Sequence, residues 1–433
     1  MAKAENTILL FKEMVGTHKI ELTKNGIPRK PIRKLIRFFQ SIEDVRLQGK
    51  VSYPLHEIIM VMFLAILSGA TTIVEISLYG EVNKRWLERH FGVKHGIPSH
   101  DTFRRVLSLI DPSHLQTATV SFLLENIKVI KRAFQIDTGI KQYCLDGKTA
   151  RRTGRLKGTE REVKQLHTLH VYDRSDGICI VSKEAGKKTN EIPVAQEILK
   201  LLDLNGSIVS FDALNTQRGT IAVIVAQKGG YVAAIKGNQP ELYQNALTTF
   251  TPSLIKRIET DSANYFEVCE KSHSRIEVRK YYLTKNVSKI AKLQDWPGLK
   301  AIAYYTLHTQ DVNTGKTTFD EHYYISSVTD AELCFDIISG HWAVENQLHW
   351  HLDVNFLEDA TEIIDRSAFQ NFSLLNKMAL SLLKLIAPLM PVTKSIRGAR
   401  RSVGWNKDLL INTFRVIDED TLSEAMQKVK TKR

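Results

Sequence analysis

The chain has 433 residues, of which 25% are charged and 43% hydrophobic, and it carries a formal net charge of +13 at pH 7. These values exclude an intrinsically disordered protein and predict two or three folded domains. The positive charge indicates a polyanion such as nucleic acid as a partner, although a basic enzyme without such a partner would have the same composition.

The N-terminal part is predicted to be basic and then helical. Residues 1–40 form a basic arm that could lie along DNA, or a solvated and partly disordered terminus. Residues 41–137 show apolar residues at helical spacing, which predicts a helical, DNA-binding domain. Within it, Ser99 or Asp101 could cap a short helix that presents Arg104 and Arg105 to DNA, although a plain surface helix fits the same pattern.

Residues 138–239 and 328–390 are predicted to form one α/β domain. The order of the elements is three strands, a helix, a strand, a helix and a strand, which predicts a mixed sheet of the RNase H-like type. A long helix that begins near Asp330 and an apolar helix at 372–386 follow. The strands are expected at 143–145, 166–172, 178–182, 208–211 and 231–235, and the two intervening helices at 191–202 and 220–227.

Residues 240–327 interrupt this domain. They hold a helix near 242–249 and strand-like runs at 277–283, 300–307 and 322–325, which predict a β-rich insertion. Residues 391–433 are predicted to be a basic C-terminal tail.

Cysteine spacing and hydropathy disfavour two further classes of protein. The four cysteines lie far apart without a C-x-x-C pair, which argues against a zinc site and against a disulfide framework. The N-terminus has no signal-peptide pattern, and the most apolar run, Ile58–Ala70, is shorter than the roughly 20 residues that span a bilayer. We therefore expect a cytoplasmic protein with no membrane partner.

Two aspartates occupy corresponding places in the predicted sheet. Asp146 directly follows the strand at 143–145, and Asp212 directly follows the strand at 208–211. A carboxylate buried at a strand end is costly unless a group such as a divalent cation neutralises it. Either aspartate alone would more often be a turn or cap residue, but the matched pair favours a metal site. Two metal ions about 4 Å apart can clamp the attacking and leaving oxygens of a phosphodiester.

A third carboxylate is predicted on the long helix. His341, Glu345, His349 and Asp353 recur every four residues and would share one helical face. Glu345 is the candidate metal ligand, and His341, His349 and Asp353 are expected to support the ligands. Ordinary intrahelical pairs are the competing interpretation, and the absence of an H-E-x-x-H motif argues against zinc.

Several cationic side chains are predicted to contact DNA phosphates. A basic cluster follows Asp146, a lysine ends the strand at 231–235, and cationic and apolar residues alternate in the insertion. Turn positions and ordinary half-exposed strands fit some of these equally well. The candidates are Lys148, Arg151, Arg152, Arg155, Lys236, His273 and Arg275, together with Arg104 and Arg105 of the helical domain.

An ordered set of motifs covers roughly residues 35–415 and resembles the H-repeat-associated insertion-sequence transposases (the ISAs group) of the DDE superfamily. The motifs run from the helical domain to the long helix. They include Leu145–Lys148, Lys188–Ile192, Phe211–Ala213, Ala234–Gln239, Ser274–Glu277, Tyr324–Ser327 and His341–Asp353.

The resemblance implies Asp146, Asp212 and Glu345 as the catalytic acids, in an RNase H-like domain with a β insertion before the glutamate. It also implies two Mg²⁺ ions, or Mn²⁺, as cofactors, DNA as substrate, and association with the bacterial nucleoid. A homodimer on DNA is expected because two ends must be joined. The helix departs from the tyrosine-arginine-glutamate-lysine pattern of related transposases: His341 falls at the arginine position and Leu352 at the lysine position.

We therefore expect metal-dependent cleavage of DNA at the ends of an insertion sequence, followed by attack of the freed 3′-OH on target DNA. One alternative is a nuclease that uses the same acids but does not join DNA. Another is a transposase-derived DNA-binding protein without catalysis. A polyanion-binding structural protein would show no metal dependence.

Overall fold

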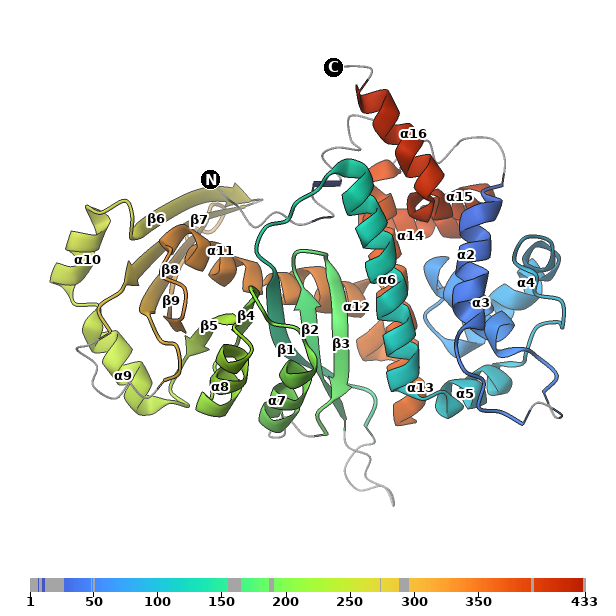
Figure 1. The fold of residues 1–433 in the computed structure, drawn as a ribbon, viewed down its shortest axis with the longest axis horizontal. Helices are drawn as coiled ribbons and strands as arrows, with labels where there is room; N and C mark the ends of the chain where they lie inside the picture. Colours follow the sequence, from blue (N-terminus) through green and yellow to red (C-terminus); the bar gives the residue numbers. More distant parts are fainter. Residues whose placement is uncertain are drawn as a thin grey trace.

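The computed structural model describes residues 7, 10, 11, 27–47, 49, 51–154, 165–186, 191–272, 274–287, 296–390 and 393–430. Within these residues the strands form a nine-stranded sheet with the order β3-β2-β1-β4-β5-β9-β8-β7-β6. A group of helices packs at one end of this sheet, and the strands of the insertion lie at the other end (Figure 1).

The first five strands have the RNase H-like arrangement. Strand β1 (Gln142–Ala150) pairs antiparallel with β2 (Leu166–Asp173), which pairs antiparallel with β3 (Ile178–Glu184). On its other side β1 pairs in parallel with β4 (Ile208–Phe211), which pairs in parallel with β5 (Gly230–Ile235). The predicted α/β fold class, with an RNase H-like mixed sheet, is confirmed.

Side chains of the central strands alternate between two helical layers. Leu145 of β1 packs with apolar residues of α7 (Glu191–Leu201) and α8 (Arg218–Ala226) on one face. The opposite face packs against α11 (Ala331–His341). Because successive side chains of a strand point to opposite faces, Asp146 points to the α11 side of the sheet.

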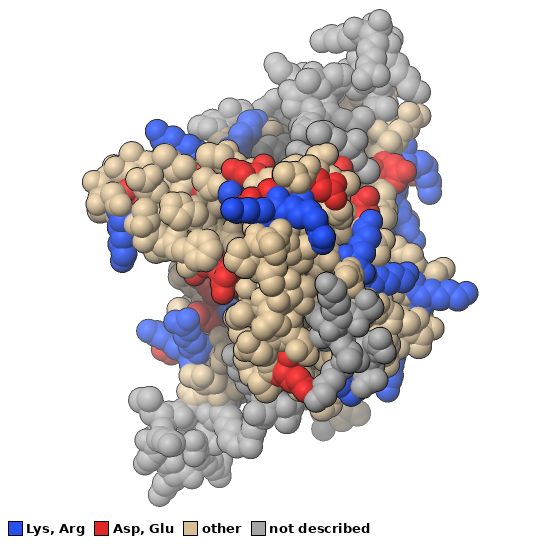
Figure 2. Space-filling view, turned by 90° about the vertical axis from the view of Figure 1, so that its left-hand side faces the viewer, with Lys and Arg blue, Asp and Glu red and all other residues tan. Residues whose placement is uncertain are grey.

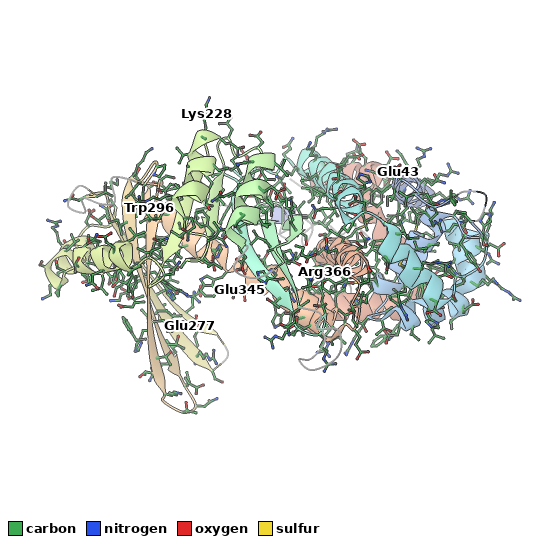
Figure 3. All side chains as sticks on the ribbon, turned by 90° about the horizontal axis from the view of Figure 1, so that it is seen from below. Glu43, Lys228, Glu277, Trp296, Glu345 and Arg366 are labelled. Atoms are coloured by element: carbon green, nitrogen blue, oxygen red, sulfur yellow. The ribbon has the colours of Figure 1, made fainter. Side chains whose placement is uncertain are left out.

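The insertion continues the same sheet. After α9 (Pro240–Thr249) and α10 (Pro252–Glu259), strands β6, β7, β8 and β9 pair antiparallel with one another, and β9 pairs antiparallel with β5. Only the last four residues of β9 pair with β5. The parts of β6, β7, β8 and β9 that lie beyond this pairing extend away from the central strands as an arm, on which Glu277 is labelled in Figure 3. The four strands are β6 (Tyr265–Ser272), β7 (Arg275–Thr284), β8 (Ala301–Asp311) and β9 (Thr317–Ser326).

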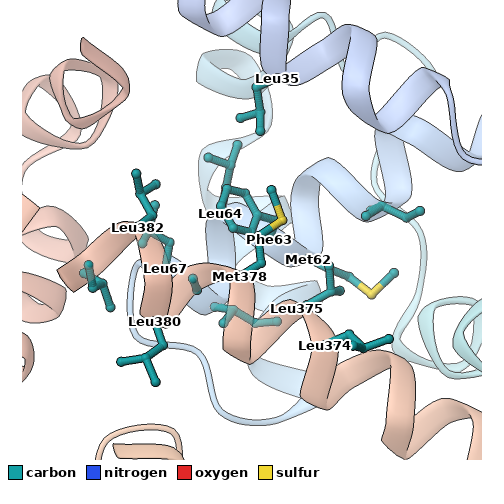
Figure 4. Close-up of a cluster of buried hydrophobic side chains, with 14 of the residues drawn as sticks. Leu35, Met62, Phe63, Leu64, Leu67, Leu374, Leu375, Met378, Leu380 and Leu382 are labelled. Atoms are coloured by element: carbon teal, nitrogen blue, oxygen red, sulfur yellow. The ribbon is translucent and has the colours of Figure 1, made fainter. Parts of the chain in front are cut away.

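The helices outside the sheet pack around α13 (Arg366–Ile386), in which nearly every residue is buried. Figure 4 shows Leu374, Leu375 and Met378 of this helix beside Met62 and Phe63 of α3. The surrounding helices are α2 (Arg29–Gln40), α3 (Leu55–Leu67), α4 (Ile73–Phe91), α5 (His100–Leu109), α6 (Pro112–Phe134), α14 (Ile396–Trp405), α15 (Lys407–Thr413) and α16 (Glu419–Lys430).

Helix α13 is also the one described helix that passes a length and hydropathy test for crossing a membrane. Together with the short 3-10 turn that follows it, this helix spans Arg366–Leu389, and 89% of its most apolar 18-residue stretch is buried inside the protein. Core helices of globular proteins commonly pass this test, so it is weak evidence for a membrane span.

Several predicted boundaries differ from the structure. Strand β1 continues through Asp146 to Ala150 instead of ending at residue 145, because it keeps pairing with β2 after its pairing with β4 has ended at Phe211. Strand β6 and helix α10 have no counterpart among the predicted elements. At the sheet edge, exposed charged residues of β6 interrupt the apolar alternation that predicts a strand.

The chain after residue 365 belongs physically with the N-terminal helices. Helix α13, predicted as part of the sheet domain, shares a core with α2, α3 and α6. The segment predicted as a basic tail forms α14, α15 and α16. Arg400 of α14 is buried and donates hydrogen bonds to the carbonyl oxygens of Ile66 and Ala70, so it stabilises this packing. The division into domains stays a prediction.

Candidate active site

Asp146 and Asp212 lie at the same level of two neighbouring strands. Leu145 of β1 is paired in parallel with Phe211 of β4, so the aspartate that follows each of them is placed next to the other. The side chain of Asp146 is 18% exposed. Its burial, together with the negative charges of Asp212 and Glu345, raises the pKa of Asp146 to about 7. Asp146 therefore senses the negative charges of both other predicted acids.

Glu345 begins a π-helical turn. Helix α11 ends at His341, and the turn Glu345–His349 precedes α12 (Trp350–Val354). Such turns are rare and are frequently found at functional sites. Partial burial raises the pKa of Glu345, and the nearby positive charge of Lys236 opposes this effect. Figure 3 shows Glu345 between the insertion arm and α13, next to the central strands.

The histidines of this helix have different contacts. Nδ1 of His349 lies 3.5 Å from Oδ2 of Asp146, and its Nε2 lies 2.9 Å from Nδ1 of His170 on β2. Burial lowers the pKa of His349 to about 3, so its ring is neutral near pH 7. Nδ1 of His341 lies 3.0 Å from the hydroxyl of Ser210 instead of contacting an acid. Of the two, His349 is therefore the one that contacts a predicted catalytic carboxylate.

Lys148 is nearly buried, with 9% of its side chain exposed. Its ammonium group lies 2.5 Å from Oδ1 of Asp353 and 3.1 Å from Oδ1 of Asp359. In this structure the ammonium group of Lys148 is held by two carboxylates and is not presented to solvent, and a DNA phosphate contact by Lys148 stays a prediction. Asp353 contacts Lys148, and its predicted role in supporting the metal ligands stays a prediction.

Four of the remaining predicted DNA-contacting residues are exposed around the acids or on the arm. The positive charge of Lys236 lowers the pKa of Glu345, opposing the effect of burial. Arg151 lies 3.5 Å from a carboxylate oxygen of Asp359. The exposed residues are Arg151, Arg152, Lys236 and Arg275. Two others, Arg155 and His273, lie outside the described residues.

Arg104 and Arg105 are exposed on α5, but this helix lies among those around α13, away from β1 and β4 (Figure 1). Ser99 caps α5 by accepting a hydrogen bond from the backbone N–H of Thr102, as predicted. The structure therefore does not bring these arginines to the acids.

Charge on the arm end of the molecule is mixed. Figure 2 shows lysine and arginine side chains interspersed with acidic ones and with wide uncharged areas, and not one continuous basic patch. Net charge alone therefore does not locate a DNA path over this face.

Sequence reasoning missed a fourth carboxylate at the site. Glu191 begins α7, is 2% exposed, and lies 2.5 Å from Nε2 of His167. Its other oxygen accepts a hydrogen bond from Nδ2 of Asn215, which also donates to Asp212. Glu191 stands in the motif Lys188–Ile192, so its position was visible in the sequence, but nothing in a helix start indicates a catalytic role.

The chemistry of these side chains suits a hard divalent cation. The candidate donors are carboxylate oxygens. Next to Asp212, Oδ1 of Asn215 is buried without a hydrogen-bond partner among the described residues, so polar capacity at the site is left unused. Burial, and after it the negative charges of Asp212 and Glu345, raise the pKa of Asp146, and a bound cation would neutralise that charge. Within the described residues, no three Asp, Glu, His or Cys side chains are close enough together to enclose a metal ion. The donors fit the predicted cation in type, while the ligand set is not assembled.

Comparison with known proteins gives related sequences over most of the chain. A family described as "DDE_Tnp_1-associated" matches residues 36–123. "Putative transposase YncI" of Escherichia coli O157:H7 is 30% identical over 381 residues, which are 87% of this chain and 93% of that protein. "H repeat-associated putative transposase YhhI" of Escherichia coli strain K12 is 29% identical over 81% of this chain and 90% of that protein.

Two further matches are more limited. "Inactive transposase YbfQ" of Escherichia coli strain K12 is 32% identical over 77 residues, 18% of this chain and 92% of that protein. Among solved structures, a piggyBac transposase synaptic complex with hairpin DNA matches 98% of this chain and 82% of that chain, with a TM-score of 0.35 and 13% identity.

Proposed function

This chain belongs to the family of the H repeat-associated transposases, and on that premise we propose that it is a DDE transposase that cleaves the ends of an insertion sequence and joins them to target DNA. The observation that carries the proposal is the juxtaposition of Asp146, on β1, and Asp212, directly after β4, with Glu345 near enough for its charge to raise the pKa of Asp146. Its substrate is DNA, bound by a homodimer that associates with the nucleoid.

Asp146, Asp212 and Glu345 would hold two Mg²⁺ or Mn²⁺ ions, which would supply Lewis-acid activation and charge stabilisation for an in-line displacement at phosphorus. The protein provides no covalent nucleophile. In cleavage, a water oxygen bonds to phosphorus and the 3′-oxygen of the element end leaves as a 3′-OH. In joining, that hydroxyl oxygen bonds to a target phosphorus and displaces the target's own 3′-oxygen.

The chain's own groups orient these acids and receive the DNA. His349, a neutral imidazole beside Asp146, holds the direction of that carboxylate. Lys236, exposed and close enough to act on Glu345, places positive charge where a phosphate must arrive. Arg151, Arg152 and Arg275 are further phosphate contacts in this proposal.

The test is cleavage of a supercoiled plasmid that carries candidate element ends, with Mg²⁺ or Mn²⁺. Glu345→Ala is expected to abolish nicking at the ends, while Glu332→Ala, which removes an exposed glutamate of α11, is expected to leave it unchanged. Nicked ends without joined products would favour the nuclease. Tight DNA binding with no cleavage by the wild type would favour a non-catalytic DNA-binding protein.

A further inference from the structure

A chain of hydrogen-bonded polar groups, buried at its centre, connects β1, β2 and α7 to Asp212. Thr149 Oγ1 lies 2.7 Å from Nδ1 of His167, and Nε2 of His167 lies 2.5 Å from Oε1 of Glu191. Oε2 of Glu191 accepts from Nδ2 of Asn215 at 3.1 Å. Asn215 then donates to Oδ1 of Asp212 twice, from Nδ2 and from its backbone N–H, both at 3.1 Å.

The direction of the hydrogen bonds in this chain is constrained. An ionised carboxylate only accepts, so Glu191 takes one hydrogen from His167 and one from Asn215. The amide nitrogen of Asn215 has two hydrogens, and one goes to each carboxylate. Asn215 is therefore a bridge between Glu191 and Asp212, and both of its nitrogens fix the same oxygen of Asp212.

The hydrogen-bonded side chains of Glu191 and His167 lie so close to the backbone of β1 that a side chain at Gly147 would not fit. A Cβ atom at Gly147 would lie 2.7 Å from Oε1 of Glu191 and 2.9 Å from Nε2 of His167. Glycine next to Asp146 thus lets the Glu191–His167 pair lie against β1. Glu191, His167 and Asn215 are each less than 5% exposed, so their hydrogen bonds are shielded from water.

We propose that Asn215 and Glu191 are positioning residues for Asp212. Asn215 sets the direction of the Asp212 carboxylate, and Glu191, anchored by His167, holds the amide of Asn215 in place. Neither residue touches the DNA in this proposal, which rests on the proposed function of Asp212 as a metal ligand. Hydrogen-bond partners of ligating groups typically contribute about 10–100-fold in metal affinity or activity.

The experiment measures Mn²⁺ binding by electron paramagnetic resonance on the full chain bound to element-end DNA, and the Mn²⁺ concentration that gives half-maximal cleavage. Asn215→Ala and Glu191→Ala are expected to weaken Mn²⁺ binding and raise that concentration by about 10–100-fold. Glu191→Gln is expected to stay within about 3-fold of wild type, because a glutamine oxygen still accepts from Asn215 while its amide donates to the other tautomer of His167.

Matched controls separate positioning from loss of fold. Asn371→Ala removes a buried asparagine of α13 that donates to the Leu107 and Ile110 carbonyls, and Glu57→Gln changes a buried glutamate 2.8 Å from His95. Both are remote from the acids and are expected to lower thermal stability without changing the Mn²⁺ dependence. If Asn215→Ala does not fold, Asn215→Ser, which keeps one hydroxyl donor, is expected to weaken Mn²⁺ binding to a smaller extent.

Mn²⁺ binding as tight as wild type in Asn215→Ala or Asn215→Ser would overturn the proposal. It would also be overturned if Glu191→Gln weakened Mn²⁺ binding as much as Glu191→Ala, because Glu191 would then be a ligand and not a positioning residue. A wild-type protein that neither binds Mn²⁺ nor cleaves would instead refute the proposed function.

Discussion

Lys384 offers the sharpest test of how the buried polar groups of α13 affect stability. It is 8% exposed, and its ammonium group donates to the hydroxyl of Tyr172 at 3.0 Å and to the carbonyl of Gly177 at 3.1 Å. Tyr172 in turn donates to Gln347 in the π turn at 2.9 Å. Burial lowers the pKa of Lys384 from 10.5 to about 7.

The sign of the effect follows from linkage. Above pH 10.5 the amine is neutral in both the folded and the unfolded chain, so burial has no ionic cost. As the pH falls from 10.5 to 7, the unfolded chain takes up the proton and the folded chain does not, which lowers stability. At 1.36 kcal/mol per pKa unit, the cost at pH 7 and below is about 5 kcal/mol.

Lys384→Met removes this cost but loses two hydrogen bonds that contribute about 1 kcal/mol each. The variant is therefore expected to be more stable than wild type by about 3 kcal/mol at pH 7, and less stable by about 2 kcal/mol above pH 10.5. Urea unfolding at both pH values measures the difference. A variant that is less stable at pH 7, or a gain that does not shrink as the pH rises, would show that burial of the Lys384 ammonium group does not have this cost.

Other substitutions test other parts of the structure. Lys384→Met is also expected to reduce cleavage several-fold, because it releases Tyr172 from its anchor and so loosens the π turn that carries Glu345. Gly147→Ala is expected to destabilise the protein by about 1–3 kcal/mol and to impair cleavage, whereas Gly237→Ala, where a Cβ would meet nothing within 4 Å, is the neutral control in thermal melts. Lys236→Ala is expected to weaken DNA binding and to reduce the salt dependence by about one counterion, compared with Lys200→Ala, which removes an exposed lysine of α7. Equal slopes for the two variants would exclude a phosphate contact by Lys236.

Most of the central sheet could be predicted because its strands are short, buried and separated by clear turn signals. The predicted runs at 166–172, 208–211 and 231–235 each differ from the observed strands by one residue or less at either end. The end of β1 could not be predicted, because it depends on pairing with β2, and that partner is set by the tertiary fold.

The site itself was predictable only in part. Two aspartates after buried strands indicated an acidic site, but the π turn at Glu345 depends on contacts that no local pattern encodes. Lys148 looked like a surface cation because burial of a lysine depends on partners far along the chain, here Asp353 and Asp359. Asn215 and Glu191 come together only in the folded sheet.

The most direct test of the central claim is Mn²⁺ binding to the protein in complex with element-end DNA. We expect wild type to bind Mn²⁺, Asp146→Asn to bind it much more weakly, and a variant with Asp146→Asn, Asp212→Asn and Glu345→Gln to show no binding above that of the DNA alone. Undiminished Mn²⁺ binding by the folded triple variant would contradict the assignment of these three acids as the metal ligands.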